Sequence, residues 1–574
     1  MNRLQRAIVA LLALVVSSIL PAFAQTTISD PNDPIYQQID AWATRGVLKN
    51  LPQLRPYTGA MITGLLREVV ATGSSDDAQA AQGWLDSIGQ QGLRWRGNAR
   101  ANAVVGSNGK SYFLGAGPGI LLNILSKEGL GLTGRVEALA SKGTTKSVTP
   151  FGSGYDRDIG YEADSGLGGG FTVLQDLNSA MTFGNESMGI QAGFMRGSWG
   201  PIFDDGVVVG PQSPASGQVG FSWRGTGLSA DIGFYMLQQG FTDGVTHMST
   251  PDPLQPTANP LYGLSGEKYL MIHDINWSPV DWMTLGLLES VVWADRIEPL
   301  YFLPLSELFT SQSIASWGDN SFVGLSGSLY LPQNLRFDAV AYADDLDFSG
   351  MIKGDFDTKW KLAVQGALSW APPSSYLQKV ALDYTAVGPY TYTHWSEING
   401  NGDIGVLAYT NAGQNIGPAL DPDSDRVTVK ATSITVEGFQ LTGLLRLIRH
   451  GNASAGVTGY SSSTSTTGNA SGNLGDPGVA IISSTGTADI FQAGYNTGTV
   501  PQFFRFLTQS VIESSYQAGL SATWSRRLEG LGRLEASASY LFEYIANAEV
   551  AGSGPVAGNT SVKNYIQFTG GFGF

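Results

Sequence analysis

The amino-acid sequence predicts an all-β transmembrane protein, namely a large antiparallel outer-membrane β-barrel of about 16 to 18 strands with a small N-terminal helical bundle. Three observations lead to this fold class. The chain begins with a secretory leader, most of it alternates between apolar and polar residues, and its composition is rich in glycine and aromatic residues but poor in charge. Together they indicate the outer membrane of a Gram-negative bacterium.

The first 24 residues have the organisation of a secretory signal peptide. Arg3 and Arg6 precede a short apolar run, which ends in Ala22-Phe23-Ala24 before Gln25. An uncleaved membrane anchor is the less favoured alternative, because the run is shorter than the ~20 residues that a spanning helix requires. We therefore expect cleavage of residues 1–24 and export of the mature protein from the cytoplasm.

Composition favours strands over helices. Among 574 residues there are 74 Gly, 25 Phe, 22 Tyr and 13 Trp, and only 14% of residues are charged. Such residues suit strands with bulges and close packing. The chain has no Cys, so a closed hydrogen-bonded sheet must replace the disulfides common in secreted proteins. The net charge of −15 disfavours a nucleic-acid partner, because phosphates would be repelled.

Residues 25–92 are predicted to form a periplasmic unit of three amphipathic helices. In the first, Pro34 suits the opening turn and Gly46 ends the helix. Thr58 is the expected N-cap of the second helix, and the third begins at Asp76. A unit of this size buries too little surface to be a robust independent domain.

Residues 93–574 are assigned to the barrel because the apolar period changes there from 3.6 to 2. The clearest hairpin runs over residues 323–344 around a short turn at 332–334. Its strands have about the nine to eleven residues that cross a bilayer at a tilt. A large soluble sandwich is the alternative. Residues 449–496, rich in Ser, Thr and Gly, are expected to form a long exposed loop on the outer side.

The closing strand supports a membrane barrel directly. Phe568, Phe572 and Phe574 recur on the even-numbered parity, opposite small and polar residues, so this parity is expected to face lipid. An aromatic last residue after alternating apolar positions resembles the signal by which Gram-negative bacteria deliver barrels to their assembly machinery. These three phenylalanines are therefore the predicted barrel-assembly signal, and that machinery and the outer-membrane lipid are predicted partners.

No catalytic residue, metal site or cofactor is predicted. The histidines His247, His273, His394 and His450 lack metal-ligand spacing. The acidic run 421–426 has Arg426 at the place of the glycine in a calcium loop and no closing Glu, so a solvated turn is the favoured interpretation. A barrel enzyme that uses His273 or His394 is a minor alternative, since the neighbouring residues do not support it.

Glu289 is the most informative charge in the strand region. It interrupts the apolar alternation of residues 283–287, which predicts a bulge or a turn of the strand toward the lumen. Arg296 and Glu298 follow. These three residues are the candidate lumenal charges. They could line a path for sugars or ions, although a structural salt bridge inside the barrel is the commoner outcome.

Several segments resemble the Wzi-type capsule assembly family of outer-membrane barrels. They are the W-G-P segment within residues 196–223, the region 286–345 that ends in two aspartates, the Tyr-rich strand within 381–395, and the G-P-x-x-D-S-D loop within 415–426. The likeness covers residues 30 to 430 in patches. It implies a monomeric barrel of about 18 strands that attaches or organises a polysaccharide without catalysis, and it assigns no sugar-contacting residue.

The helical N-terminus also resembles the surface-layer-homology unit of anchored porins, through a helix, Arg45-Gly46, and then Arg55-Pro56 with Thr58. Two functions therefore stay open. One is a non-enzymatic barrel associated with surface polysaccharide. The other is a porin for small solutes whose helical unit contacts the cell wall or periplasmic partners.

Overall fold

The computed structural model describes the chain from residue 29 to residue 573 with gaps. The described ranges are 29–89, 92–107, 109–126, 129–143, 161–164, 172–200, 205–237, 241–242, 248–249, 268–294, 296–303, 308–315, 319–346, 353, 360–373, 376–389, 391–392, 407–411, 414–435, 438–451, 506–528, 532–550 and 554–573. The predicted signal peptide, Phe574 and residues 452–496 of the predicted exposed loop lie outside these ranges.

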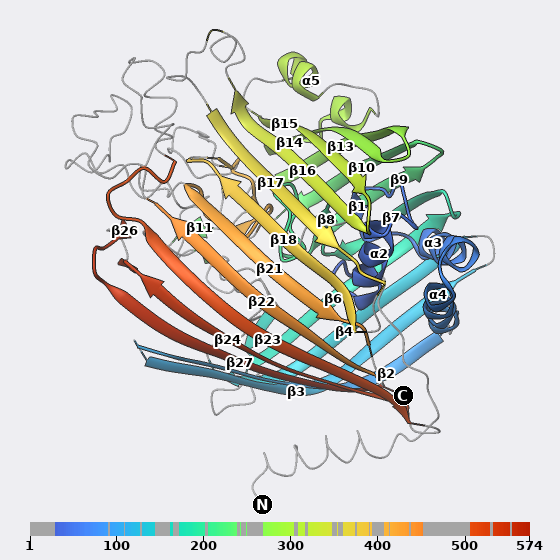
Figure 1. The fold of residues 1–574 in the computed structure, drawn as a ribbon, viewed down its shortest axis with the longest axis horizontal. Coiled ribbons are helices and arrows are strands. Elements are labelled where there is room, and N and C mark those ends of the chain that lie inside the picture. The colour runs from blue at the N-terminus through green and yellow to red at the C-terminus, as the bar shows by residue number, and fades with distance from the viewer. Residues whose placement is uncertain are drawn as a thin grey trace, which may run out of the picture.

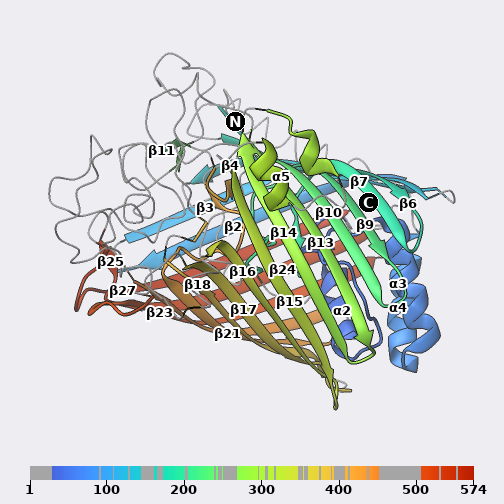
Figure 2. The ribbon, with the colours of Figure 1, turned by 90° about the horizontal axis from the view of Figure 1, so that it is seen from above.

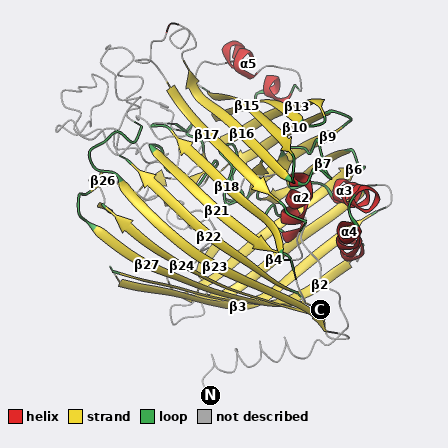
Figure 3. Cartoon of the chain, viewed as in Figure 1, coloured by secondary structure: helices red, strands yellow, loops and turns green. Residues whose placement is uncertain are grey.

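Eighteen antiparallel strands of the described chain close into one barrel (Figures 1 and 3), which confirms the predicted fold class. In chain order they are β2 (Gly92–Gly106), β3 (Gly109–Leu125), β4 (Leu130–Gly143), β6 (Thr172–Gly184), β7 (Met188–Met195), β9 (Ser216–Arg224), β10 (Leu228–Leu237), β13 (Lys268–Val280), β14 (Met283–Ala294), β15 (Asn320–Leu331), β16 (Leu335–Leu346), β17 (Trp360–Trp370), β18 (Leu377–Val387), β21 (Ser424–Ser433), β22 (Phe439–His450), β23 (Glu513–Leu528), β24 (Gly532–Ala546) and β27 (Thr560–Gly573).

The other strands of the described chain are short. β1 (Leu54–Arg55) pairs with β8 (Ser198–Trp199), and β5 (Tyr161–Asp164) pairs with β6. Three further pairs join β11 (Phe241–Thr242) to β12 (Met248–Ser249), β19 (Thr410–Asn411) to β20 (Gln414–Asn415), and β25 (Glu549–Val550) to β26 (Gly554–Pro555).

The strand pleat gives the barrel wall two different faces. On β2, Arg94 and Asn102 are buried on one side, whereas Leu93 and Trp95 are exposed on the other. The register carries this division to β27, where Phe568 lies opposite Ala101 and is 55% exposed. Apolar side chains therefore cover the outward face, as in barrels surrounded by lipid. Phe568 and Phe572 share this outward parity, and their role as an assembly signal stays a proposal.

The two ends of the barrel differ in their connections. At one end the turns are short, as between Leu331 and Leu335, where Gln333 and Asn334 both have positive φ angles of the kind that tight hairpins use. At the other end most connections are long, such as 195–216 and 387–424, although β2 and β3 are joined by a short turn. Short turns face the periplasm in outer-membrane barrels, which orients the protein.

The three N-terminal helices lie at the end with short turns (Figures 1 and 2). They are α2 (Pro34–Thr44), α3 (Gly59–Thr72) and α4 (Ser75–Ile88). The side chains of Asp33, Thr58 and Ser74 accept hydrogen bonds from the first turns of these helices, as N-caps do. The helices share a buried apolar core, which includes Ile35, Ile39, Trp42, Met61, Ile62, Leu65 and Leu66. Over the described ranges, no helix has the length and apolar character needed to cross a membrane.

Polar contacts fix the helical unit to the inner face of the wall. The backbone N–H of Gln53 donates to Asp231 at 2.7 Å, and Gln191 donates to the carbonyl of Pro56 at 2.6 Å. Arg224 of β9 donates to Glu68 of α3 at 2.6 Å. Because Asp231, Gln191 and Arg224 stand on the inward parity of their strands, the helical unit occupies the periplasmic mouth of the lumen.

A charge on the outward face should weaken the barrel in lipid. Leu325 lies within β15 and is 65% exposed. We expect Leu325→Arg to lower the free energy of unfolding in lipid vesicles by about 2 to 4 kcal/mol if this position lies near the bilayer midplane. The matched control Leu325→Met should change it by less than about 1.5 kcal/mol. Equal urea midpoints for the Arg variant and the parent would contradict the outward assignment.

Candidate functional site

Two of the long outer connections fold back into the lumen, where they form what we call the plug. Its described parts are residues 205–215, between β7 and β9, and 387–389, 391–392, 407–411 and 414–423, between β18 and β21. Its buried apolar side chains pack against inward residues of the wall. This core contains Val207, Val208, Val209, Tyr392, Tyr409, Ile416 and Leu420 from the plug, and Leu270, Ile272, Leu288, Val292, Phe322, Val340 and Tyr342 from the wall.

Tyrosine hydroxyls connect the two halves of the plug. Tyr392 donates to the carbonyl of Val207 at 2.6 Å, and Tyr409 donates to the carbonyl of Val208 at 2.9 Å. The rings of Tyr392 and Tyr409 stack with centroids 5.5 Å apart. Each ring therefore fills apolar space while its polar atom is satisfied, which is the usual condition for burying tyrosine.

Buried charges fix the plug to the wall. Arg426, at the start of β21, lies 2.9 Å from the carboxylate of Asp205, which also accepts the N–H of Ala419 at 2.7 Å. The ammonium group of Lys268 donates to the carbonyl of Ala408 at 2.7 Å. A buried charge is tolerated only when it is paired and hydrogen-bonded, so these contacts hold the plug in one position.

Three of the four segments that carry the family resemblance contribute residues to the plug. Residues 205–215 belong to the W-G-P segment, and residues 415–426 form the G-P-x-x-D-S-D loop. The prediction that 421–426 is a solvated turn is wrong, because Asp423 and Arg426 are buried. Their environment depends on Asp205, which is distant in sequence. The apolar run Val207-Val208-Val209 was a local sign that this connection is buried, but it did not indicate which part of the chain it packs against.

Glu289 lies on the outward face rather than in the lumen. β14 pairs with β15 without a register shift from Met283 to Val292. Glu289 therefore keeps the parity of the exposed Leu285 and Leu287, and the predicted bulge toward the lumen is absent from this stretch. The carboxylate is 3.3 Å from Nδ1 of His273 and accepts the N–H of Leu308 at 2.9 Å, so a neighbouring segment covers it.

The other candidate charges lie in the connection after β14. Arg296 donates to Asp319 at 2.5 Å, and its Nε is 3.6 Å from Glu298. Glu298 also caps the short 3₁₀ helix η2 (Pro299–Phe302). The structure thus brings Arg296 and Glu298 together, at the outer end of the barrel, in a structural ion pair.

The described histidines make structural contacts. His450 Nδ1 is 2.8 Å from the hydroxyl of Ser424, and His273 contacts Glu289. His247 and His394 lie outside the described residues. Within the described ranges, no group of three or more His, Asp and Glu is arranged to hold a metal ion.

A polar cavity of about 1790 Å³ lies in the lumen between the helical unit and the strands β2, β4, β21 to β24 and β27. Charged, amide and hydroxyl side chains together make up most of its lining residues. Arg96 donates to Glu535 at 2.9 Å, and Arg135 lies 3.6 Å from Asp30. Such a lining can solvate small polar molecules or ions.

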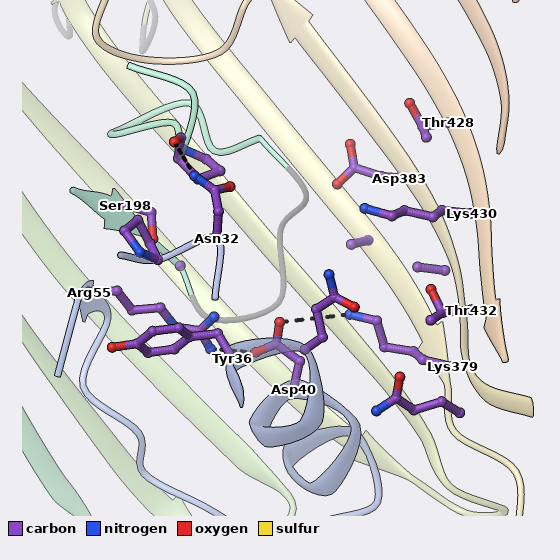
Figure 4. A pocket seen from close by; sticks show the side chains of 17 residues that line it. Asn32, Tyr36, Asp40, Arg55, Ser198, Lys379, Asp383, Thr428, Lys430 and Thr432 are labelled. Carbon is purple, nitrogen blue, oxygen red and sulfur yellow. Dashed lines mark hydrogen bonds and ion pairs between the residues drawn. The ribbon is translucent and has the colours of Figure 1, made fainter. Parts of the chain in front are cut away.

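A smaller pocket of about 120 Å³ lies where α2 faces β17, β18 and β21 (Figure 4). Asp40 of α2 accepts a hydrogen bond from Arg55 and lies 3.9 Å from the ammonium group of Lys379. Asp383 and Lys430 add charge from the wall. Charged residues of both the helical unit and the barrel wall therefore line this pocket, which lies at the contact between the two parts.

Removing the buried ion pair should loosen the plug. We expect Asp205→Ala to cost about 3 to 5 kcal/mol of unfolding free energy, because Arg426 stays buried without its carboxylate. The exposed pair of Arg67 and Glu186 supplies the control, and Arg67→Ala should cost less than about 1 kcal/mol. Urea unfolding in vesicles measures both values. Similar small losses for the two variants would contradict the anchoring role.

The docking of the helical unit should depend on pH through Asp33. Burial raises the pKa of this carboxyl group to about 7, helped by Asp30 and Glu535 and opposed by the N–H of Ile35 and by Arg135. The folded protein therefore binds more protons than the unfolded chain between about pH 4 and pH 7, so this group's contribution to stability falls as the pH rises through that window.

Asp33→Asn keeps a good N-cap and removes the titration. We expect this variant to gain stability relative to the parent at pH 8 but not at pH 4, as measured by urea midpoints. The exposed Asp76→Asn is the control and should show no such difference. A constant difference between Asp33→Asn and the parent across this range would contradict the assignment.

No family model and no curated protein matches the chain. Among solved structures, it is similar to Wzi of Escherichia coli, an outer-membrane protein involved in group 1 capsule assembly and described as a carbohydrate-binding β-barrel. The identity is 12%, the TM-score is 0.52, and the match covers 95% of this chain and 99% of that one. OprD of Pseudomonas aeruginosa matches with 10% identity, a TM-score of 0.40 and coverage of 84% and 95%.

OccAB2 of Acinetobacter baumannii matches with 8% identity, a TM-score of 0.41 and coverage of 84% and 98%. At 12% identity, the match to Wzi is evidence of fold and not of activity. At that level, the similarity to Wzi confirms the resemblance predicted from the sequence: the chain has the fold of a Wzi-type outer-membrane barrel.

Proposed function

We propose that this protein attaches or organises a polysaccharide at the cell surface, without catalysing a reaction. The observation that carries the proposal is the plug. Its buried apolar core joins two connections to the inner wall, and an apolar cluster packed to this degree leaves no path for water through that part of the lumen. A barrel filled in this way is better suited to present a surface than to conduct solutes.

The helical unit supports the same proposal at the periplasmic end. It occupies the mouth through Glu68, Gln53 and Pro56, which bond to three different strands. The lumen is thus occupied at two levels, by the plug and by the helices. The fold similarity to Wzi, which is itself described as carbohydrate-binding, makes a glycan the favoured ligand class.

A porin for small solutes is the second candidate, and the polar cavity favours it. Arg96, Arg100 and Arg135 line about 1790 Å³ of space beside the helical unit. If this space continued past the plug, it would form a charged path of the kind found in diffusion pores. The helical unit would then contact the cell wall or periplasmic partners.

Under either function the chain resides in the outer membrane, with lipid around its outward apolar face. We propose that residues 1–24 direct export. We also propose that the terminal phenylalanines Phe568, Phe572 and Phe574 are recognised by the barrel-assembly machinery.

Planar-bilayer conductance and glycan capture together test the proposal. The purified protein should conduct little, and Asp205→Ala should increase the number of conductance steps because its plug is loosened. Cells that carry the protein should retain labelled surface polysaccharide in a pull-down, whereas cells without it should not. Regular large steps from the parent protein, together with no captured glycan, would favour the porin and contradict our proposal.

A further inference from the structure

Two described parts of the connection between β14 and β15 lie against the outside of the barrel. They are residues 296–303, which include η2, and 308–315, which form α5 (Leu308–Ala315). Tyr301 and Leu308 are fully buried against an apolar cluster. The wall members of that cluster, Tyr269, Met271, Val291, Trp293, Ile232 and Phe234, all belong to the parity that points away from the lumen. We call these described residues, 296–303 and 308–315, the outer segment.

Aromatic contacts attach the outer segment to the wall. Phe234 of β10 stacks on Tyr269 of β13 with centroids 5.5 Å apart, and Phe302 lies 5.0 Å from Phe234. Tyr301 meets Trp293 edge to face at 5.0 Å. The indole N–H of Trp293 donates to the carbonyl of Arg296 at 2.9 Å. The segment is therefore packed onto the wall at both its apolar and its polar atoms.

The outer segment also covers the outward-facing pair Glu289 and His273. The N–H of Leu308 donates to one carboxylate oxygen of Glu289 at 2.9 Å, and His273 lies 3.3 Å from the other. A carboxylate on the lipid side of a barrel is costly when it meets hydrocarbon. The contact with Leu308 gives the carboxylate of Glu289 a hydrogen bond and also shields it from the hydrocarbon.

Most of the exposed side chains described in the outer segment are apolar. Ile314 is 73% exposed, Leu303 is 53% exposed, and Ile297 is exposed as well. Arg296 forms ion pairs with Asp319 and Glu298, so its charge is balanced by carboxylates of the protein. The exposed side chains continue the outward apolar band of the wall, which includes Ile275 and Leu287 below them.

The depth of the outer segment matches the edge of the membrane. From Trp282 at the periplasmic turn to Trp293, β14 rises by roughly 36 Å. At a tilt of about 45° this corresponds to about 25 Å across the membrane, which is the height of the apolar band of such barrels. Trp293 therefore lies at the outer boundary of the hydrocarbon, where aromatic residues are favoured. The segment packed on it extends below this boundary, because Leu308 contacts Glu289, four residues earlier on the same strand.

We propose that the outer segment is seated in the outer leaflet of the membrane, where Leu303 and Ile314 contact lipid acyl chains. The outer segment is thus a membrane-interface element. Acyl chains are the favoured occupant because the exposed apolar surface is continuous with the lipid-facing wall. A second copy of the chain would be the alternative occupant.

The absence of Cys from the sequence allows a direct test by single-cysteine labelling of the full chain. Ile314→Cys and Leu303→Cys would each carry an environment-sensitive fluorophore in vesicles that contain lipids spin-labelled on their acyl chains. Leu287→Cys is the lipid-facing control. Ala557→Cys, at an exposed position in the connection between β24 and β27, is the water-facing control.

We expect the labels at positions 303 and 314 to be quenched by the spin-labelled lipids to at least half the extent seen at position 287, independently of the protein-to-lipid ratio. Two results would overturn the proposal. One is quenching no greater than at position 557, together with rapid reaction of both cysteines with a membrane-impermeant maleimide. The other is protection that disappears on dilution into excess lipid, since this would identify a second copy as the occupant.

Discussion

A backbone that crosses a bilayer has no water to satisfy its N–H and C=O groups, so every strand needs a hydrogen-bonded neighbour on each side. The seam between β2 and β27 meets this requirement, with Arg96 opposite Gly573 and Gly106 opposite Lys563. Once the seam is closed, the register of each strand is fixed, and so is the face on which each side chain stands. The plug, the cavity and the lipid-facing band all follow from that division.

Closure by itself does not decide what the lumen holds. Here the inward faces of β13 to β16 carry apolar residues such as Ile272, Leu288 and Phe322, whereas β2 and β4 carry Arg96, Arg100 and Arg135. The first surface packs the plug, and the second lines the polar cavity. The lumen thus contains two regions: one is filled by the packed apolar core of the plug, and the other is an open cavity with a polar lining. The packed region favours polysaccharide attachment, whereas the polar cavity favours the diffusion of small solutes.

The sequence was sufficient to predict the barrel and the outward parity of Phe568, because both follow from a period that is visible in a single strand. It was insufficient for Glu289. The alternation rule assigns a charge to the lumen, and the hydrogen bond from Leu308 that permits an outward carboxylate comes from a connection with no periodic pattern. The plug was also missed, since Asp205 and Arg426 lie 221 positions apart and neither residue indicates the other.

That separation has a consequence for biogenesis. Asp205 follows β7, the fifth strand of the wall, whereas Arg426, which neutralises it, stands on β21, the fourteenth. The ion pair therefore requires both strands to be in place, whatever the order in which the sheet is assembled. The plug cannot fill the lumen until the wall has brought these two distant strands to one interior.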